Sequence, residues 1–340
     1  MATTNRRITL SRRPKGAVTE DLFKIEEAPM PDLRDGEVLV KTTYLSIDPT
    51  IRGWLERDTY LPAIEIGAVV RSSGVGEVVA SRNKEFSPGD RVFAMVGWQE
   101  YSVHGPDSRL RGIPPGVSPT DALGVLGLNG TTAYFGLLDV GRPKAGETVV
   151  VSGAAGATGS VAGQIAKLEG CRVIGIAGSD AKCAWLTDEA GFDGAINYKT
   201  EDVGARLTET CPEGIDVFFD NVGGPILDEV LARLALRARV VLCGAISQYN
   251  RMDDVYAPRN YMNLVMRRAR MEGFLVLDYF DRLPQAVMKL AGWVAEGKIK
   301  HRTTVVDGLE NTVSAFQRLF SGDHEGKLVV RVARSDAPTS

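Results

Sequence analysis

The chain has 340 residues, of which 44% are hydrophobic and 24% charged, and its 40 Lys and Arg residues nearly balance its 43 Asp and Glu residues. This length predicts two domains, and the balanced charge excludes a strong field for nucleic acid or an anionic membrane as partner. No apolar run approaches the roughly 18 to 20 residues of a membrane span.

The first half of the chain predicts a β-rich domain. A first strand is expected around 7–11, and Gly and Pro then separate short β-branched runs at 38–40, 67–80, 91–95 and 100–103. We expect the end of the chain to rejoin this domain, which we assign to 1–125 with 300–340. The last eight residues are polar, and we expect them to be loose.

After Pro143 the pattern changes to strands that alternate with helices. We expect strands at 147–152, 171–177, 194–198, 215–221, 239–244 and 271–276, helices at 160–169, 203–210, 226–236, 283–296 and 309–320, and a closing strand at 327–332. Repeated βα units predict a parallel sheet with helices on both faces. The fold class is therefore α/β, with a Rossmann-type doubly wound sheet in a domain at 126–299.

A glycine-rich turn, Gly153-Ala-Ala-Gly-Ala-Thr-Gly159, lies directly between the first of these strands and its helix. Glycines at this place allow a sharp turn and let the backbone approach a pyrophosphate, which then meets the positive end of the helix. The turn predicts a dinucleotide site that includes Gly153, Ala155, Gly156, Ala157, Thr158 and Gly159. The alternative is a strand–helix turn without a ligand.

The residues after the second strand favour NADP(H) over NAD(H). An NAD-selective site has an acidic residue about 20 positions after the turn, whereas Gly178 and Ser179 stand there. Lys182 and Tyr198 follow and offer a cation and a hydroxyl to a 2′-phosphate. Asp180 is the contrary observation, and we expect it to cap the next helix. The alternative for Lys182 is a solvated helix lysine.

Cysteine usage predicts a reduced, cytoplasmic protein. The four cysteines, Cys171, Cys183, Cys211 and Cys243, are spread without C-x-x-C spacing. None of the three histidines is near a cysteine in sequence, so the chain has no recognisable zinc-ligand cluster. We therefore expect no metal.

Six motifs lie between residues 45 and 274. They are Leu45-Ser-Ile-Asp-Pro49, Gly130-Thr-Thr-Ala-Tyr134, Ala154-Ala-Gly-Ala-Thr-Gly-Ser-Val161, Asp220-Asn-Val-Gly-Gly224, Cys243-Gly-Ala-Ile-Ser247 and Met271-Glu-Gly-Phe274. In this order they resemble the zinc-independent branch of the medium-chain dehydrogenase/reductase superfamily, which contains prostaglandin reductases (leukotriene B4 dehydrogenases), plant alkenal double-bond reductases and bacterial curcumin reductases. The resemblance implies a GroES-like β-rich domain, a homodimer and NADPH-dependent reduction of the C=C bond of an α,β-unsaturated aldehyde or ketone.

The resemblance also implies roles for single residues. Lys182 and Tyr198 would meet the 2′-phosphate. Other cofactor contacts would come from Asn129, Gly178, Ser179, Asn221, Cys243, Gly244, Ala245, Ile246, Tyr249 and Gly326, with Phe274, Leu275 and Val276 against the nicotinamide. These residues belong to the predicted Rossmann domain, except Gly326 in the returning tail.

The departures from the family concern the substrate. The family often has Asp-Pro-Tyr-Met-Arg where this chain has Asp48-Pro-Thr-Ile-Arg52, so Thr50 replaces an aromatic hydroxyl, and Asn129 replaces a proline. We expect the substrate pocket to include Tyr44, Thr50, Arg52 and Tyr60. The alternatives are that aromatics such as Tyr60 and Trp54 only pack within the domain, and that Asp48 and Arg52 form a structural ion pair or cap.

Tyr249 is the candidate catalytic residue, because it follows a strand end, where ligands of open α/β sheets bind. Hydride addition to the β-carbon of an enone leaves negative charge on the carbonyl oxygen, which a hydroxyl can stabilise without a metal. The same hydroxyl can deliver a proton to the α-carbon. The alternatives are a tyrosine that only packs against the cofactor, a quinone oxidoreductase of the same superfamily, and a non-catalytic NADPH-binding sensor or structural protein.

Overall fold

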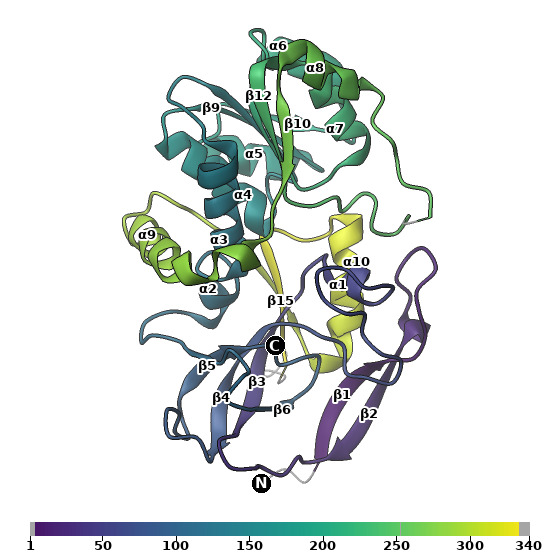
Figure 1. The fold of residues 1–340 in the computed structure, drawn as a ribbon, viewed down its shortest axis with the longest axis vertical. Coiled ribbons are helices and arrows are strands. Elements are labelled where there is room, and N and C mark those ends of the chain that lie inside the picture. Colours follow the sequence, from purple (N-terminus) through teal and green to yellow (C-terminus); the bar gives the residue numbers. More distant parts are fainter. Residues whose placement is uncertain (1–3, 252, 333–340) are drawn as a thin grey trace, which may run out of the picture. The chain divides into compact units, whose positions relative to one another are not determined.

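The computed structural model describes residues 4–251 and 253–332 and divides into two compact units (Figure 1). Unit 1 comprises the described residues of 4–123, 303–324 and 328–332, and unit 2 comprises those of 124–302 and 325–327. The predicted loose tail, 333–340, lies outside the described residues. Within the part of the chain that is described, no helix is long and apolar enough to cross a membrane.

Unit 1 is built on a sheet of seven strands. Their order is β14-β15-β3-β4-β5-β7, and β6 pairs with β3. They are β3 (Val38–Ser46), β4 (Gly74–Ser81), β5 (Arg91–Ala94), β6 (Tyr101–His104), β7 (Arg111–Gly112), β14 (Thr303–Asp307) and β15 (Lys327–Arg331). The remaining elements are the hairpin of β1 (Thr4–Leu10) and β2 (Phe23–Pro29), the helices α1 (Ile51–Trp54), α2 (Pro119–Leu123) and α10 (Thr312–Ser321), and the 3-10 turns η1 (Glu20–Leu22) and η5 (Leu309–Asn311).

One predicted strand of unit 1 is too long. The run 67–80 was expected to be extended throughout, but β4 begins only at Gly74. The residues before it bond to the hairpin instead: the Leu10 N–H donates to the Ala68 carbonyl, and the Val70 N–H donates to the Ile8 carbonyl. Valines occur on both sides of Gly74, and the two segments differ in their pairing partner.

Unit 2 contains a six-stranded parallel sheet in the order β10-β9-β8-β11-β12-β13. The strands are β8 (Thr148–Ser152), β9 (Arg172–Ala177), β10 (Gly194–Asn197), β11 (Ile215–Asp220), β12 (Leu234–Leu242) and β13 (Arg270–Gly273). The helices are α3 (Leu128–Phe135), α4 (Ala157–Leu168), α5 (Asp180–Asp188), α6 (Val203–Thr210), α7 (Gly224–Leu231), α8 (Asn263–Arg267) and α9 (Leu283–Ala295), with the shorter turns η2 (Gly136–Gly141), η3 (Asn260–Met262) and η4 (Val276–Arg282). Successive strands are added on one side of β8 up to β10 and then on its other side from β11 to β13. This change of side is that of a Rossmann sheet, so the predicted fold class is confirmed.

Both faces of this sheet are buried. Val149 and Val151 of β8 enter one hydrophobic core, whereas Val150 between them enters the core on the opposite face. Side chains alternate across a strand, so a strand covered on both faces must be apolar at every position. This is why the strands appear in the sequence as continuous hydrophobic runs.

The helix predicted at 226–236 is wrong at its C-terminal end. α7 ends at Leu231, and β12 begins at Leu234, which pairs with Ile215 of β11. Arg237 then adopts a positive φ of 61°, which no helix accommodates. The leucines at 231 and 234 have helical spacing, but pairing with β11 decides the outcome.

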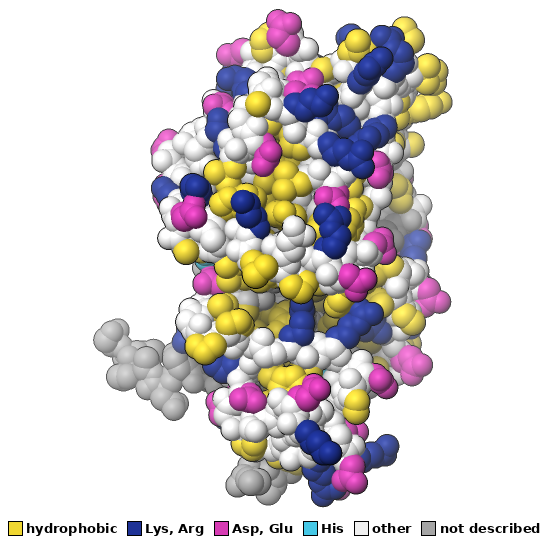
Figure 2. Space-filling model, turned by 60° about the vertical axis from the view of Figure 1, so that its left-hand side comes forward, with side chains coloured by type: hydrophobic (Ala, Val, Ile, Leu, Met, Phe, Trp, Pro, Cys, Tyr) yellow, Lys and Arg dark blue, Asp and Glu magenta, His cyan; other side chains and the backbone are white. Residues whose placement is uncertain are grey.

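The surface matches the balanced composition. On the face that Figure 2 shows, each group of Lys and Arg side chains has Asp or Glu side chains beside it, and hydrophobic side chains gather between them. Ion pairs occur among the charged side chains of the protein, including Arg302 with Glu189 and Glu325. The face therefore has no broad area of one sign.

Candidate cofactor and substrate sites

The predicted phosphate turn joins β8 to α4. Gly153 has a positive φ of 58°, and the Gly156 N–H donates to the Gly153 carbonyl at 3.0 Å. A Cβ at Gly159 would lie 2.4 Å from that same carbonyl oxygen, so only glycine fits there. Gly156 precedes α4 without a side-chain cap. The first N–H groups of this twelve-residue helix therefore have no hydrogen bond from a side chain of the cap residue. Such an open helix N-terminus is the arrangement that suits an anion.

Gly326 lies directly against this turn. Its N–H donates to the Ala155 carbonyl at 3.2 Å, and it forms a parallel bridge with Gly156. A Cβ at Gly326 would lie 1.9 Å from the Arg302 carbonyl oxygen, and its φ is 58°. Arg302 in turn holds the neighbouring Glu325 at 2.8 Å. The three residues 325–327 thus return to unit 2 and brace the phosphate turn.

The residues predicted for a 2′-phosphate gather at the ends of β9 and β10. A Cβ at Gly178 would lie 3.0 Å from the ring of Tyr198, which is 43% exposed, and Ser179 caps α5 by accepting from the Lys182 N–H at 3.3 Å. Asp180 was expected to be the cap, which is wrong. It is the first residue of the helix, and its carboxylate accepts from the Asn197 side chain at 2.7 Å.

A buried polar group joins the ends of β8 and β11. The Ser152 hydroxyl donates to Asp220 at 2.7 Å and accepts from the Asn221 N–H at 2.9 Å. The same Asp220 oxygen accepts from the Val222 and Gly223 N–H groups, and the Asn221 amide donates to the Ser152 carbonyl at 2.7 Å. Burial raises the pKa of Asp220, against the lowering effect of these donors.

Ser152 and Asp220 were not among the predicted site residues. Asn221 was, and this network holds it beside Gly153, where a Cβ would be 3.4 Å from the Asn221 side chain. The signal in the sequence was a polar residue at the end of each apolar strand, Ser152 after Val149 to Val151 and Asp220 after Phe219.

The segment after β12 is bonded to the same strand end. The Cys243 and Gly244 N–H groups donate to the Asp220 carbonyl, and the Ile246 N–H donates to the Asn221 carbonyl. The Tyr249 hydroxyl turns back over Gly244 and accepts from the Ala245 N–H at 3.2 Å. In this bond the Tyr249 oxygen is the acceptor.

The cysteine of this segment is unsuited to nucleophilic chemistry. Burial raises the pKa of the Cys243 thiol to about 12, and the nearby Asp220 contributes to the increase. The thiol is therefore protonated at neutral pH, and a thiol is a poor nucleophile. Cys243 therefore contributes a small, neutral side chain to the segment after β12.

Asn129 and Phe274 have different surroundings within unit 2. The Asn129 amide on α3 donates to the Thr158 hydroxyl of the phosphate turn at 3.4 Å. The Phe274 ring packs beside Gly136, where a Cβ would lie 2.3 Å from it, and it belongs to the hydrophobic core. The Phe274 side chain is therefore committed to packing, which leaves the backbone of 274–276 for any nicotinamide contact.

The predicted substrate residues of unit 1 do not form one group. The Thr50 and Tyr60 hydroxyls lie 2.6 Å apart, and the Tyr60 ring meets Trp54 edge-on at 6.0 Å between centroids. Arg52 is buried, donates to Glu56 at 2.6 Å and to the Gly16 carbonyl at 3.0 Å, and is thus a structural ion pair. Tyr44 packs in a small cluster with Val75, Leu123 and Val329. The structure thus brings together Thr50 and Tyr60.

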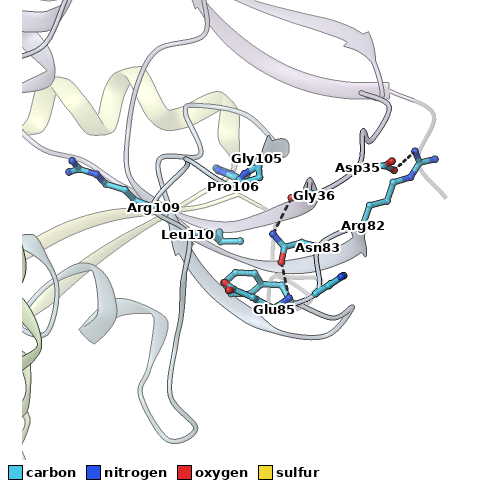
Figure 3. Close-up of a pocket in the computed structure, with 12 residues that line it drawn as sticks. Asp35, Gly36, Arg82, Asn83, Glu85, Gly105, Pro106, Arg109 and Leu110 are labelled. Atoms are coloured by element: carbon cyan, nitrogen blue, oxygen red, sulfur yellow. Dashed lines mark hydrogen bonds and ion pairs between the residues drawn. The ribbon is translucent and has the colours of Figure 1, made fainter.

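A surface pocket of about 620 Å³ lies elsewhere in unit 1 (Figure 3). It is lined by Asp35, Gly36, Arg82, Asn83, Lys84, Glu85, Phe86, His104, Gly105, Pro106, Arg109 and Leu110. Figure 3 shows Arg82 turned toward Asp35 and Asn83 bonded to the Gly36 carbonyl. No predicted site residue lines it, so it is distinct from the sites described above.

Two family models match the chain. The N-terminal domain of oxidoreductase matches residues 6–111, and a model described as zinc-binding dehydrogenase matches residues 157–292. Despite that description, no group of three or more His, Cys, Asp or Glu side chains that could hold a metal occurs in 4–251 or 253–332.

Similar proteins extend over the full length. A putative NADP-dependent oxidoreductase of Bacillus subtilis is 46% identical over 98% of this chain and 99% of its own. The NADPH-dependent curcumin reductase of Escherichia coli is 39% identical over 98% of both chains. The crystal structure of CurA from Vibrio vulnificus in complex with NADPH is 41% identical and covers 97% of this chain and 100% of its own, with a TM-score of 0.92.

The chain therefore belongs to the medium-chain dehydrogenase/reductase family of oxidoreductases. Within that family, its relatives fall in the branch of NADP-dependent reductases that the six sequence motifs indicated, and the predicted resemblance is confirmed. These relatives match nearly the whole chain, so the similarity includes the β-rich unit as well as the unit with the Rossmann sheet.

Proposed function

We propose that the protein uses NADPH to reduce the C=C double bond of α,β-unsaturated ketones or aldehydes. The observation that carries this proposal is the full-length similarity to a curcumin reductase, together with a TM-score of 0.92 to a protein solved with NADPH. Prostaglandin reductase 1 of rat, at 40% identity over 95% of this chain, and the NADP-dependent 2-alkenal reductase of tobacco, at 42% over 88%, support the same reaction class.

The residues of unit 2 fit a dinucleotide that carries a 2′-phosphate. The turn at Gly153 to Gly159 is so closely packed that a Cβ at Gly159 would collide with backbone, as expected where a backbone cradles a pyrophosphate. At the end of β9, Asp180 accepts from the Asn197 side chain, and Tyr198 lies beside Gly178. Lys182 and Tyr198 are the residues assigned to the phosphate. A cation and a hydroxyl are suitable donors for that group.

Tyr249 is the group of unit 2 that handles the proton. Bound NADPH supplies the hydride, which adds to the β-carbon and leaves an enolate. The Tyr249 oxygen accepts from the Ala245 N–H, and the role assigned to this hydroxyl is to stabilise the enolate oxygen or to pass its proton to the α-carbon. One hydride and one proton then complete the saturated product.

A panel of carbonyl compounds tests this function. NADPH absorbance is followed with a medium-chain 2-alkenal, a conjugated aryl ketone, a naphthoquinone and the saturated aldehyde that matches the alkenal. We expect consumption with the first two and none with the saturated aldehyde. Consumption with the quinone alone would contradict the proposal in favour of a quinone oxidoreductase. Tight NADPH binding without any turnover would instead indicate a sensor.

We also propose that the protein is a homodimer that associates through the β13 edge of unit 2. β13 is the last strand of the sheet, and all four of its residues are exposed. On α8, which packs on β12, Val265 is 65% and Met266 is 68% exposed. An uncovered strand edge beside apolar side chains favours pairing with a second copy.

Light scattering after size exclusion tests the dimer. The double variant Val265→Asp with Met266→Asp should be a monomer. Met288→Asp is the matched control, since Met288 is 71% exposed on α9, which packs in the core of the opposite sheet face. A double variant of unchanged mass would refute the proposed surface.

We propose a cytoplasmic location. All four cysteines are free thiols, and burial raises the pKa of Cys171 and Cys183 to about 11. Unpaired cysteines are usual in a reducing compartment and unusual in an oxidising one. Cell fractionation followed by detection of the protein checks the location.

A further inference from the structure

A buried carboxylate on α7 binds a segment that comes much later in the chain. Asp228 is 5% exposed, and each of its carboxylate oxygens accepts a hydrogen bond. The Tyr256 hydroxyl donates to one oxygen and the Asn260 N–H donates to the other, both at 2.8 Å. The Asn260 side chain also donates to the Asp228 carbonyl at 3.2 Å. A carboxylate is costly to bury unless donors reach it, so Asp228 fixes residues 256–260 against α7.

The backbone of Tyr256 is bonded to a second buried side chain. Its N–H donates to the Gln248 side-chain oxygen at 2.8 Å. The nitrogen of the same amide donates to the Ser247 hydroxyl at 2.7 Å, and that hydroxyl donates to the Val222 carbonyl at 2.6 Å. Gln248 is only 9% exposed, and both ends of its amide are bonded. These bonds therefore define where Gln248 lies.

A glycine at the start of α7 makes room for this amide. A Cβ at Gly224 would lie 2.7 Å from the Gln248 side-chain nitrogen and 2.9 Å from the Ser247 hydroxyl oxygen, and the φ of Gly224 is 60°. A side chain there would displace the Gln248 amide from its bonds and would strain the backbone. The last glycine of the motif Asp220-Asn-Val-Gly-Gly224 thus has a specific neighbour in the structure.

Gln248 directly precedes Tyr249, and the two residues belong to one turn. The Gln248 N–H donates to the Ala245 carbonyl at 2.8 Å, and the Tyr249 hydroxyl accepts from the Ala245 N–H at 3.2 Å. A Cβ at Gly244 would lie 3.1 Å from the Tyr249 hydroxyl oxygen. A displacement of Gln248 therefore moves the backbone from which the Tyr249 side chain starts.

We propose that Asp228 is a positioning residue for Tyr249, which acts through Tyr256 and Gln248 to fix the turn that carries the Tyr249 side chain. The inference rests on the proposed function, in which the Tyr249 hydroxyl handles the proton. Proton transfer needs its donor within hydrogen-bond distance, and a displacement of about 1 Å can lower a rate about 100-fold. The effect of Asp228 on the rate is exerted through Tyr249.

Single substitutions test each link. Asp228→Ala and Gln248→Ala should each lower kcat for the enone about 10-fold to 100-fold. Tyr256→Phe removes one hydroxyl and should lower kcat about tenfold or less. Asp228→Asn keeps a side-chain oxygen for the Asn260 N–H and should retain more of kcat than Asp228→Ala. If Asp228→Ala is unfolded by its melting temperature, the Tyr256 and Gln248 variants decide.

Asp216→Ala is the matched control. The Asp216 carboxylate also accepts from a backbone N–H of unit 2, that of Thr148, at 2.9 Å. Thr148 begins β8, whereas the phosphate turn follows the other end of that strand. This variant should keep the kcat of the unmodified protein.

A double-mutant cycle separates positioning from a merely structural role. Tyr249→Phe removes the hydroxyl that Asp228 is proposed to position, so adding Asp228→Ala to Tyr249→Phe should lower kcat no further. A structural role predicts the same fold-loss from Asp228→Ala in both backgrounds.

Hydrogen exchange tests the same link without the reaction. Asp228→Ala should raise the exchange rate of the Tyr256 N–H about tenfold to a hundredfold, because hydrogen bonds to a charged group no longer hold that segment. The Thr148 N–H is bonded to Asp216 and should exchange at an unchanged rate in the same sample.

The outcomes distinguish this inference from the proposed function. If the unmodified protein reduces enones and Asp228→Ala keeps its kcat, or loses it equally with and without Tyr249→Phe, the positioning role is overturned while the function stands. Unchanged exchange at the Tyr256 N–H would also overturn it, since Asp228 would then not hold the bond to Gln248. If the unmodified protein reduces no enone or enal, both the function and the positioning role are overturned.

Discussion

The phosphate turn of unit 2 and the paired Thr50 and Tyr60 hydroxyls of unit 1 are built in opposite ways. At the turn, the neighbours that exclude a Cβ from Gly159 are backbone atoms of Gly153 and Ala154. In the Thr50–Tyr60 pair, the contact is a hydrogen bond between two side chains, and both side chains are solvent-accessible. A site made of backbone constrains every residue in it, whereas a site made of exposed side chains can change without disturbing the fold.

The comparison predicts its largest effect at Gly159. Gly159→Ala places a methyl group 2.4 Å from the Gly153 carbonyl oxygen, so the turn must move. We expect the free energy of unfolding to fall by about 2 to 3 kcal/mol, and NADPH binding to be lost. Urea unfolding and a fluorescence titration with NADPH measure the two effects.

Gly292→Ala is the matched control for this prediction. Gly292 lies in α9 with no atom near the position of a Cβ, so alanine should raise stability by up to about 1 kcal/mol. If Gly159→Ala bound NADPH as tightly as the unmodified protein, the turn would not be the rigid cradle described above.

Acid should weaken unit 1 through His104. This residue is 5% exposed, lies 2.8 Å from the Ser102 hydroxyl, and burial lowers its pKa to about 4. The fold favours the neutral ring, so the stabilisation is complete above the ordinary pKa of 6.5 and is lost as the pH falls toward 4. The difference corresponds to at most about 3 kcal/mol. His104→Gln should flatten this part of the pH dependence of the unfolding free energy.

Asp220 in unit 2 should act with the opposite sign. Its pKa is raised by burial, so the folded state holds the proton more tightly than the unfolded state does. The associated stabilisation is lost as the pH rises from 3.8 through the folded pKa. Asp220→Asn should remove this loss, as measured by urea unfolding between pH 4 and 7. An identical slope in the variant would contradict the assignment.

Cofactor preference should change at Lys182. Lys182→Ala should weaken NADPH binding about tenfold to a hundredfold, because hydrogen bonds to charged groups contribute roughly 1.5 to 3 kcal/mol. NADH has no 2′-phosphate, so its affinity should hardly change. Lys167→Ala serves as the control, since that lysine pairs with Asp193 at 2.7 Å. Equal affinities for both cofactors in the unmodified protein would refute the phosphate assignment.

The smallest effect is expected at the helix cap beside Lys182. Ser179→Ala removes the acceptor of the Lys182 N–H and should cost about 1 kcal/mol in the free energy of unfolding. The Ser179 hydroxyl bonds to the backbone of α5, so its loss should affect the position of the helix and change the NADPH and NADH affinities together. A loss confined to NADPH would show instead that the Ser179 hydroxyl meets the phosphate itself.

Local patterns in the sequence were sufficient for the Rossmann sheet and its turn. Hydrophobic runs of strand and helix length, and glycines at 153, 156 and 159, depend on residues close together in the chain. The boundary between α7 and β12 was not predictable in the same way, because Leu234 is a strand residue only through its pairing with Ile215. Nor was the capping role of Ser179, since the neighbouring Asp180 is an equally good capping residue until Asn197 binds it.

The sequence by itself therefore determined the α/β fold class, the phosphate turn and the family, all of which follow from local periodicity and motifs. Tertiary structure alone decided which side chains meet: Ser152 with Asp220 across 68 residues, and Gly326 with Ala155 across the fold of unit 2. It also separated Thr50 and Tyr60, which pair, from Arg52, which is buried against Glu56. The physical reason is that a hydrogen bond depends on distance in space, which the order of residues does not state.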